Sequence, residues 1–145
     1  VLICAALDRC FMAGIAYFLG LRKLGATAIR AGSGQPDLVA ELILKQRPNV
    51  LVGVPSLFVA IGRKLQQAGI DPSRCGVDKL VCIGEPIRNP DLSLAPLGEI
   101  LRDSWGAEVL GTYASTEMAT AFADCSAACG GHLINFTFKS TKHLI

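Results

Sequence analysis

The chain has 145 residues, which is the size of one domain and enough to bury a hydrophobic core. Its 14 basic and 12 acidic residues are interspersed and give a net charge of only +2, which disfavours nucleic-acid binding. The longest apolar run, Cys10 to Leu21, is shorter than the roughly 20 residues that a membrane span requires, and nothing resembles a signal peptide. We therefore expect a cytoplasmic protein without a membrane span.

Short apolar runs alternate with amphipathic stretches along the chain. Pro36, Pro55 and Pro96 stand at helix starts, and Gly69 and Gly106 follow helix ends. The expected strands are 1–7, 26–30, 50–54, 79–83 and 108–113, and the expected helices are 10–23, 36–46, 55–68 and 96–105. Because the strands are almost unbroken apolar runs separated mostly by helices, we predict an α/β fold: a mostly parallel sheet with helices on both faces.

Ligands of open parallel sheets bind at the carboxyl ends of the strands. Three segments follow predicted strands in this way: Val54-Pro55-Ser56, Gly84-Glu85-Pro86 and Tyr113 to Glu117. We expect these three segments to share one edge of the sheet and to form a binding site.

The segment Gly111-Thr112-Tyr113-Ala114-Ser115-Thr116-Glu117-Met118 carries the most chemistry. Backbone N–H groups and hydroxyls after a strand suit an anion, and a Glu beside them suits a divalent metal ion. Two ordinary interpretations stay open. Thr116-Glu117 before an apolar run is also a common helix start, and Tyr113 is also a common core aromatic residue.

Residues Thr112 to Ala119 (TYASTEMA) resemble the Tyr-Gly-x-Thr-Glu motif of the adenylate-forming, AMP-binding superfamily of acyl-CoA ligases. Val81 to Arg88 (VCIGEPIR) is similar to the adenine-side loop of those enzymes, and Asn49 to Phe58 (NVLVGVPSLF) is similar to an earlier strand-to-helix turn. The phenylacetate-CoA ligase branch is the most similar. The resemblance implies a partial adenylation domain over 1–133 and an unassigned tail over 134–145.

This resemblance implies an ATP-dependent acid–thiol ligase. Such an enzyme activates a carboxylic acid, here an aryl or phenylacetate-like one, as an acyl-adenylate and transfers the acyl group to CoA. The implied cofactors are ATP or AMP, Mg²⁺ and CoA, and a homodimer of the full-length protein stays open. The phosphate loop of the family and its C-terminal domain with a Lys are not found among these 145 residues, so we expect a fragment that is inactive by itself.

The resemblance also assigns individual roles. Thr116 would hydrogen-bond a phosphate oxygen, and Glu117 would hold Mg²⁺. The nucleotide would lie against Gly84, Glu85, Pro86, Tyr113, Ala114 and Ser115. Within this set, Tyr113 would lie along the adenine, and Gly84 would let the backbone approach the ring closely. Ala114 stands where the wider superfamily prefers Gly, so either the loop differs there or no Gly is needed.

Three assignments have alternatives. Ser56 fits a helix start as well as the wall of an acyl pocket. Glu85 also fits a surface ion pair with Arg88. Cys125 and His132 look like half of a Zn²⁺ site of the phenylacetate-CoA ligase branch, with Cys129 as a third nearby residue of uncertain direction. The alternative is a flexible Gly-rich loop with ordinary thiols.

Two other classes of protein share the alternating pattern. A flavodoxin-like nucleotide-binding module would show it too, although Gly32-Ser33-Gly34 lacks the spacing of a phosphate fingerprint. A non-catalytic α/β packing module would keep the apolar strands without binding any ligand. Binding of an adenine nucleotide, of flavin or of neither separates the three classes.

Overall fold

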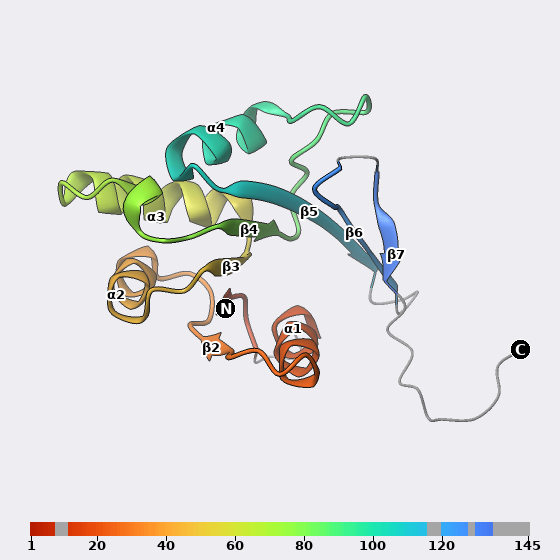
Figure 1. Cartoon of the computed structure of the whole chain (residues 1–145), viewed down its shortest axis with the longest axis horizontal. Coiled ribbons are helices and arrows are strands. Elements are labelled where there is room, and N and C mark those ends of the chain that lie inside the picture. The colour runs from red at the N-terminus through yellow and green to blue at the C-terminus, as the bar shows by residue number, and fades with distance from the viewer. Residues whose placement is uncertain (8–11, 116–119, 128–129, 135–145) are drawn as a thin grey trace, which may run out of the picture.

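The computed structural model describes residues 1–7, 12–115, 120–127 and 130–134. Its helices are α1 (Met12–Lys23), α2 (Pro36–Gln46), α3 (Pro55–Gln67) and α4 (Pro96–Trp105), with a short 3-10 helix η1 at Pro72–Arg74. Its strands are β1 (Leu2–Cys4), β2 (Ile29–Arg30), β3 (Val50–Gly53), β4 (Lys79–Cys82), β5 (Glu108–Ser115), β6 (Thr120–Ala123) and β7 (His132–Ile134). Figure 1 shows how these elements are arranged.

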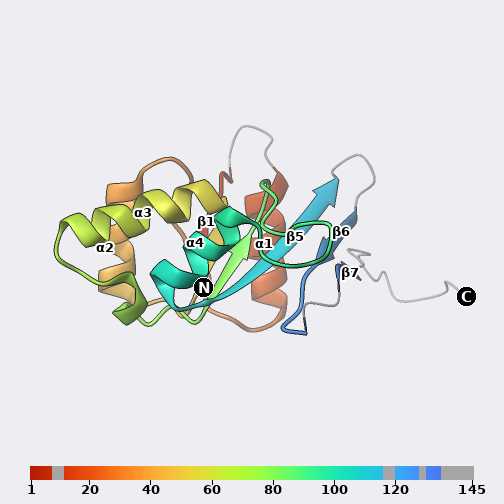
Figure 2. The ribbon, with the colours of Figure 1, turned by 90° about the horizontal axis from the view of Figure 1, so that it is seen from above.

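The described strands form one sheet in the order β2-β1-β3-β4-β5-β6-β7. Strands β1 to β5 are parallel to one another, whereas β6 is antiparallel to β5 and β7 is antiparallel to β6. The predicted α/β fold with a mostly parallel sheet is therefore confirmed. Figure 2 shows that β5, β6 and β7 extend to one side, beyond the helices that cover the parallel strands.

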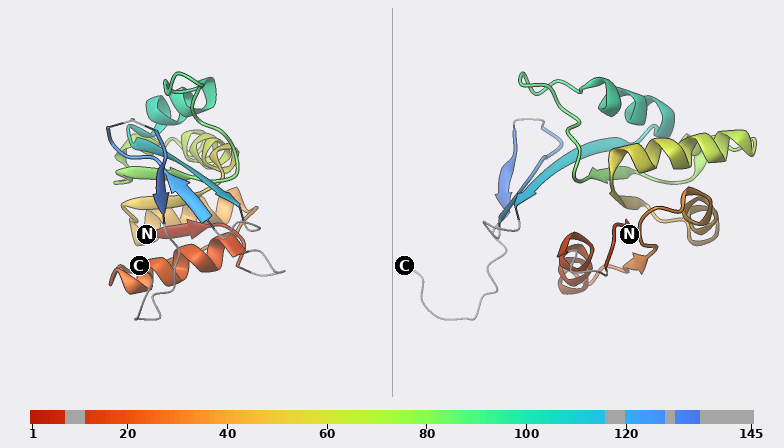
Figure 3. Two further views of the ribbon diagram at one scale, coloured as in Figure 1. Left: turned by 90° about the vertical axis from the view of Figure 1, so that its right-hand side faces the viewer. Right: turned by 180° about the vertical axis from the view of Figure 1, so that it is seen from behind.

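Helices α2, α3 and α4 cover one face of the parallel sheet, and α1 lies on the other (Figures 1 and 3). Successive side chains of a strand point to opposite faces, so a sheet covered on both sides needs apolar residues at every position. Strand β3 illustrates this requirement, because Leu51 packs in the cluster under α2, α3 and α4 while Val52 packs in the cluster under α1. Helices on both faces were predicted and are found.

The larger cluster centres on Trp105 and Phe58, which are fully buried. The indole N–H of Trp105 donates to the backbone carbonyl of Phe58 at 3.3 Å, so the polar atom of this buried ring is satisfied. This bond joins α4 to α3. The bond therefore helps to hold α3 in the layer that covers the sheet. The first residues of α3, Pro55 and Ser56, belong to the predicted site.

The region after β4 differs in part from the sequence prediction. Strand β5 was expected to end at Tyr113 but continues to Ser115, and the strands β6 and β7 were not expected at all. The reason is that β5 beyond Gly111 pairs with β6, from Thr112 with Ala123 to Ser115 with Thr120. Short, mixed strands of this kind carry only a weak periodic signal.

No helix among the described residues is long and apolar enough to cross a membrane. Helix α1 is the most apolar helix, and it ends with the two basic residues Arg22 and Lys23 after only 12 residues.

Candidate functional site

The ends of three adjacent parallel strands define the edge of the sheet where the predicted site lies. Gly53 pairs with Cys82, and Cys82 pairs with Gly111, so β3, β4 and β5 reach this edge in register. Parallel strands present their carboxyl ends at a common edge. The loop after β3, the loop after β4 and the continuation of β5 therefore start side by side, as the sequence predicted.

Glu85 and Ser56 join the first two of these segments. The Glu85 carboxylate accepts a hydrogen bond from the Ser56 backbone N–H at 2.9 Å and another from the Ser56 hydroxyl at 2.8 Å. Ser56 is the second residue of α3, and N–H groups in the first turn of a helix have no partner within the helix. Ser56 is thus a helix-start residue whose N–H is capped from the neighbouring loop.

Gly84 has a φ of +77°, in the left-handed region that favours glycine. A Cβ at this position would meet no protein atom within 4 Å. The backbone conformation alone therefore accounts for a glycine here. Gly84 and Pro86 are both exposed, so this loop faces solvent.

Tyr113 and Ala114 lie on β5, where they pair with Phe122 and Ala121 of β6. Tyr113 is 65% exposed, so its interpretation as a core aromatic residue is wrong. Ala114 does not have a positive φ, and a β-strand conformation needs no glycine. Ser115 ends the strand.

Thr116 and Glu117, which the resemblance assigned to phosphate and Mg²⁺, lie outside the described residues. The chain on either side of them is strand, since β5 ends at Ser115 and β6 begins at Thr120. The alternative of a helix start at Thr116-Glu117 falls on the same undescribed residues, and the residues Thr120–Ala123 that follow belong to the sheet.

A hydroxyl chain below this edge was missed by the sequence prediction. The Thr112 hydroxyl donates to the backbone carbonyl of Cys82 at 3.0 Å, and the Tyr17 hydroxyl lies 3.0 Å from the same Thr112 oxygen. Because Thr112 has a single hydroxyl proton, Tyr17 is the donor to Thr112. Burial raises the pKa of Tyr17, which keeps this donor protonated. A tyrosine in an otherwise apolar helix was the available signal, since a buried hydroxyl needs a partner.

Arg88 forms an ion pair with Asp124, the residue that follows β6. Only 6% of the Asp124 side chain is exposed, and Arg88 also donates to the backbone carbonyl of Leu92 at 2.8 Å. The proposed alternative, a surface pair between Glu85 and Arg88, is therefore wrong. Glu85 and Arg88 bind different partners, and Arg88 anchors the carboxyl-terminal end of the loop 84–88.

Cys125 and His132 lie close together, with 3.1 Å between the sulfur and the Nε2 atom. Cys125 follows the end of β6 by two residues and His132 begins β7, so the pairing of these two strands brings them together. Cys129 lies outside the described residues. Among the described residues no group of three or more His, Cys, Asp or Glu side chains is placed to hold a metal ion. The described donors therefore supply two ligands, fewer than the four of a closed structural Zn²⁺ site.

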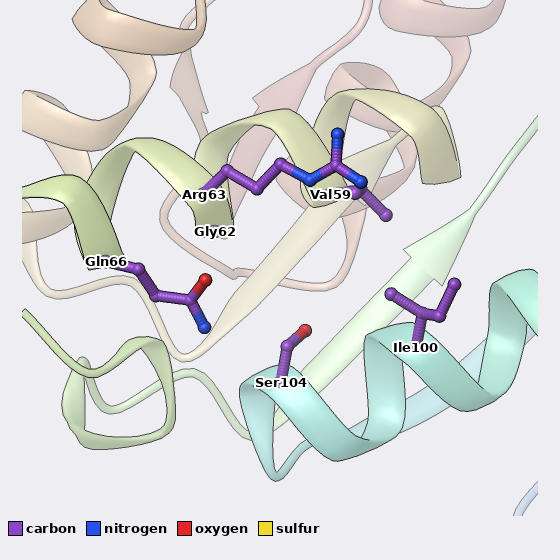
Figure 4. Close-up of a pocket in the computed structure, with 6 residues that line it drawn as sticks. All are labelled: Val59, Gly62, Arg63, Gln66, Ile100 and Ser104. Atoms are coloured by element: carbon purple, nitrogen blue, oxygen red, sulfur yellow. The ribbon is translucent and has the colours of Figure 1, made fainter.

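A surface cavity of about 220 Å³ lies between α3 and α4, as Figure 4 shows. Its lining includes Val59, Arg63 and Gln66 from α3 and Ile100 and Ser104 from α4. These residues lie along the helices, away from the Pro55-Ser56 start of α3. The cavity is therefore separate from the edge where the loops meet.

No protein-family model matches the chain. The phenylacetate-coenzyme A ligase of Aromatoleum evansii is 26% identical over 76 residues, which make up 52% of this chain and 17% of that enzyme. Among solved structures, 2-hydroxyisobutyryl-CoA ligase in complex with R3-HIB-AMP matches with a TM-score of 0.69 and 23% identity over 83% of this chain. The benzoate-CoA ligase of Burkholderia xenovorans LB400 matches with a TM-score of 0.63 and 24% identity over 89% of this chain.

The chain has the fold of an acyl-CoA ligase segment. The resemblance to acyl-CoA ligases that the sequence indicated is thereby confirmed. The chain spans 26% of the 2-hydroxyisobutyryl-CoA ligase and 25% of the benzoate-CoA ligase. In this acyl-CoA ligase fold, the segments that resemble the family motifs begin on the adjacent strands β3, β4 and β5.

Proposed function

We propose that the chain is part of an ATP-dependent acid–thiol ligase, which activates a carboxylic acid as an acyl-adenylate and passes the acyl group to CoA. One observation carries this proposal. The sequence segments that resemble the family's motifs leave three neighbouring strands at one edge of the sheet, in a fold shared with solved acyl-CoA ligases. Fold alone does not imply function, so the coincidence of motif and position is what supports it.

The reaction has two steps with balanced bonds. A carboxylate oxygen of the acid attacks the α-phosphorus of ATP, a new O–P bond forms, and the bond to pyrophosphate breaks. A thiol then attacks the acyl carbon, and AMP leaves with the electron pair of the C–O bond. Both steps depend on positioning and charge neutralisation more than on covalent help from the protein.

The site residues divide this task. The exposed ring of Tyr113 offers a stacking surface for adenine, and the loop from Gly84 to Pro86 forms the opposite side. Thr116 binds a phosphate oxygen. Glu117 would hold Mg²⁺, which would neutralise phosphate charge.

The acid is proposed to be aryl or phenylacetate-like and the acceptor to be CoA. The sequence match to a phenylacetate-CoA ligase and the fold match to a benzoate-CoA ligase support the aryl class. An open form of 2-hydroxyisobutyryl-CoA ligase in complex with 2-HIB-AMP and CoA has the same fold, with a TM-score of 0.69, and this supports the acceptor.

These 145 residues supply only part of such a site, because they span about a quarter of the solved ligases. We expect weak binding of adenine nucleotides and no turnover by the isolated chain. Release of pyrophosphate that depends on both ATP and a carboxylic acid would contradict the expected lack of turnover.

Nucleotide binding tests the proposal directly. Isothermal titration with AMP and ATP should show binding that Tyr113→Ala weakens by at least about fivefold, because a stacked aromatic ring contributes about 1–3 kcal/mol. Glu117→Ala should weaken ATP binding in the presence of Mg²⁺ more than AMP binding. Leu24→Ala is the control, since this exposed apolar side chain lies at the end of α1. Binding of flavin in place of adenine nucleotides would favour the flavodoxin-like class.

We also propose that Cys125 and His132 supply half of a Zn²⁺ site. The 3.1 Å between their sulfur and nitrogen atoms supports this, because thiolate and imidazole both bind Zn²⁺ and here lie on one hairpin. Titration of the purified chain with Zn²⁺ tests it. Weak binding whose affinity falls in both Cys125→Ser and His132→Ala is expected, whereas an affinity that is unchanged in both variants would reject the site.

A further inference from the structure

In the part of the chain that the structure describes, three carboxylates each accept hydrogen bonds from both the N–H and the hydroxyl of a serine. Asp71 accepts from Ser73 at 3.0 and 2.8 Å, and Asp91 accepts from Ser93 at 3.0 and 2.5 Å. In both of these pairs the residues are two apart, so the bonds close a local turn. The third pair, Glu85 with Ser56, makes the same two bonds between residues that are 29 apart.

The long-range pair differs in what it holds. A local turn forms whenever its own few residues adopt the right backbone conformation. The Glu85 pair forms only when the loop after β4 lies against the start of α3. The residue before α3, Val54, makes no side-chain hydrogen bond to the helix, so Glu85 takes the part of the missing N-cap.

The same loop is anchored at its other end. Arg88 pairs with the almost fully buried Asp124, and Asp124 also accepts from the backbone N–H of Cys125 at 3.2 Å. The loop 84–88 is therefore tied to α3 on one side and to the β5–β6 hairpin on the other. A loop held at both ends has few conformations left to lose when a ligand binds.

We propose that Glu85 is a positioning residue, whose carboxylate holds the loop 84–86 on α3 so that the loop is preformed for the adenine of the nucleotide. This inference rests on the proposed function. It changes the expectation for Glu85 itself, because the carboxylate is turned to Ser56 and acts through the loop. Its negative charge is directed at the amino end of a helix, where the helix dipole stabilises it.

The experiment compares four variants of the 145-residue chain by isothermal titration with AMP. Glu85→Gln and Ser56→Ala should each weaken binding by about tenfold, since each removes a hydrogen bond to a charged group. The double variant should be no weaker than the poorer single one, because the two residues act as a unit. Ser56→Thr should bind AMP with wild-type affinity, since threonine keeps the N–H and a hydroxyl.

Asp71→Asn is the matched control. It alters the same kind of carboxylate–serine pair at η1, which precedes the start of β4, whereas the loop 84–86 follows the end of that strand. AMP affinity should be unchanged in this variant. If Asp71→Asn lost as much AMP affinity as Glu85→Gln, loss of any carboxylate–serine pair would weaken binding. That result would overturn the positioning role of Glu85.

Amide spectroscopy without nucleotide tests the contact independently of binding. In Glu85→Gln the amide proton of Ser56 should move upfield, and the amides of 84–88 should exchange faster. If wild-type protein binds no AMP, the proposed function fails while these spectra still report on the contact. If wild-type protein binds AMP and Glu85→Gln binds it equally well, only the positioning role fails. Should Glu85→Gln not fold, Ser56→Ala provides the same test.

Discussion

The two faces of the sheet are built very differently. Of the helices that the structure describes, three cover one face and bury Trp105 and Phe58 completely, whereas one, α1, packs on the other. On its outer side α1 leaves Met12, Ile15 and Leu19 between 40% and 56% exposed. Exposed apolar side chains that gather on one side of a helix are typical of a surface that meets other protein. The comparison shows that the first face is a finished core, while α1 on the second face leaves an exposed apolar surface.

The largest effect is expected in the finished core. Trp105→Ala should lower the free energy of unfolding by about 3–5 kcal/mol, because it leaves a large cavity and removes the hydrogen bond to Phe58. Urea denaturation followed by circular dichroism measures this loss. Ile100→Ala on the same helix is the control, since half of its side chain is exposed. Similar losses in the two variants would mean that the three-helix layer is not the principal core.

The second prediction concerns the contact of α1 with Ala6, which lies just after β1. A Cβ at Gly14 would lie 2.2 Å from the carbonyl oxygen of Ala6, so Gly14→Ala should destabilise the fold by about 1–3 kcal/mol. Gly20→Ala in the same helix meets no atom within 4 Å and should stabilise the fold by about 0.5–1 kcal/mol. Thermal unfolding of both variants checks the pair. Equal shifts in the same direction would show that α1 does not pack closely at Gly14.

The third prediction tests the link between α1 and the site. Tyr17→Phe removes the donor to Thr112 and should lower stability by about 1 kcal/mol. Thr112 keeps its own bond to the Cys82 carbonyl, which limits the loss. Denaturant titration provides the measurement, and Tyr113→Phe, with an exposed ring, serves as the control. A loss in Tyr113→Phe as large as in Tyr17→Phe would contradict the buried hydroxyl chain.

The smallest effect lies at the opposite edge of the sheet, where β4 and β5 begin. The hydrogen bond from Lys79, with a further one from Ser126, lowers the pKa of Glu108 below its usual value. A lowered pKa in the folded state means that this stabilisation is present above the unfolded pKa and is lost as the pH falls through the folded value. The free energy of unfolding should be measured from about pH 6 to about pH 2, a range that contains the usual carboxyl pKa values. It should fall less with decreasing pH in Glu108→Gln than in the wild-type chain. An unchanged pH profile would remove Glu108 from the groups that link folding to pH.

The sequence determined the regular part of this fold by itself. Pro36, Pro55 and Pro96 each stand at the first position of a helix in the structure, and the expected helices end within one residue of the observed ends. These signals are local, because the fixed φ of proline and the missing N–H act within a single turn. The unbroken apolar strands predicted the parallel sheet with two covered faces, because a strand that is buried on both faces needs apolar residues at every position.

Only the tertiary structure decided which polar partners meet near the site. Glu85 faced Arg88 as its obvious partner in the sequence, yet it caps α3 through Ser56, and Arg88 pairs with Asp124, 36 residues away. Strand β6 likewise forms because β5 supplies an edge with which it can pair, and β7 in turn pairs with β6. Such contacts are made between residues far apart in the chain, and their energies depend on packing that brings the segments together. No pattern within one segment encodes them.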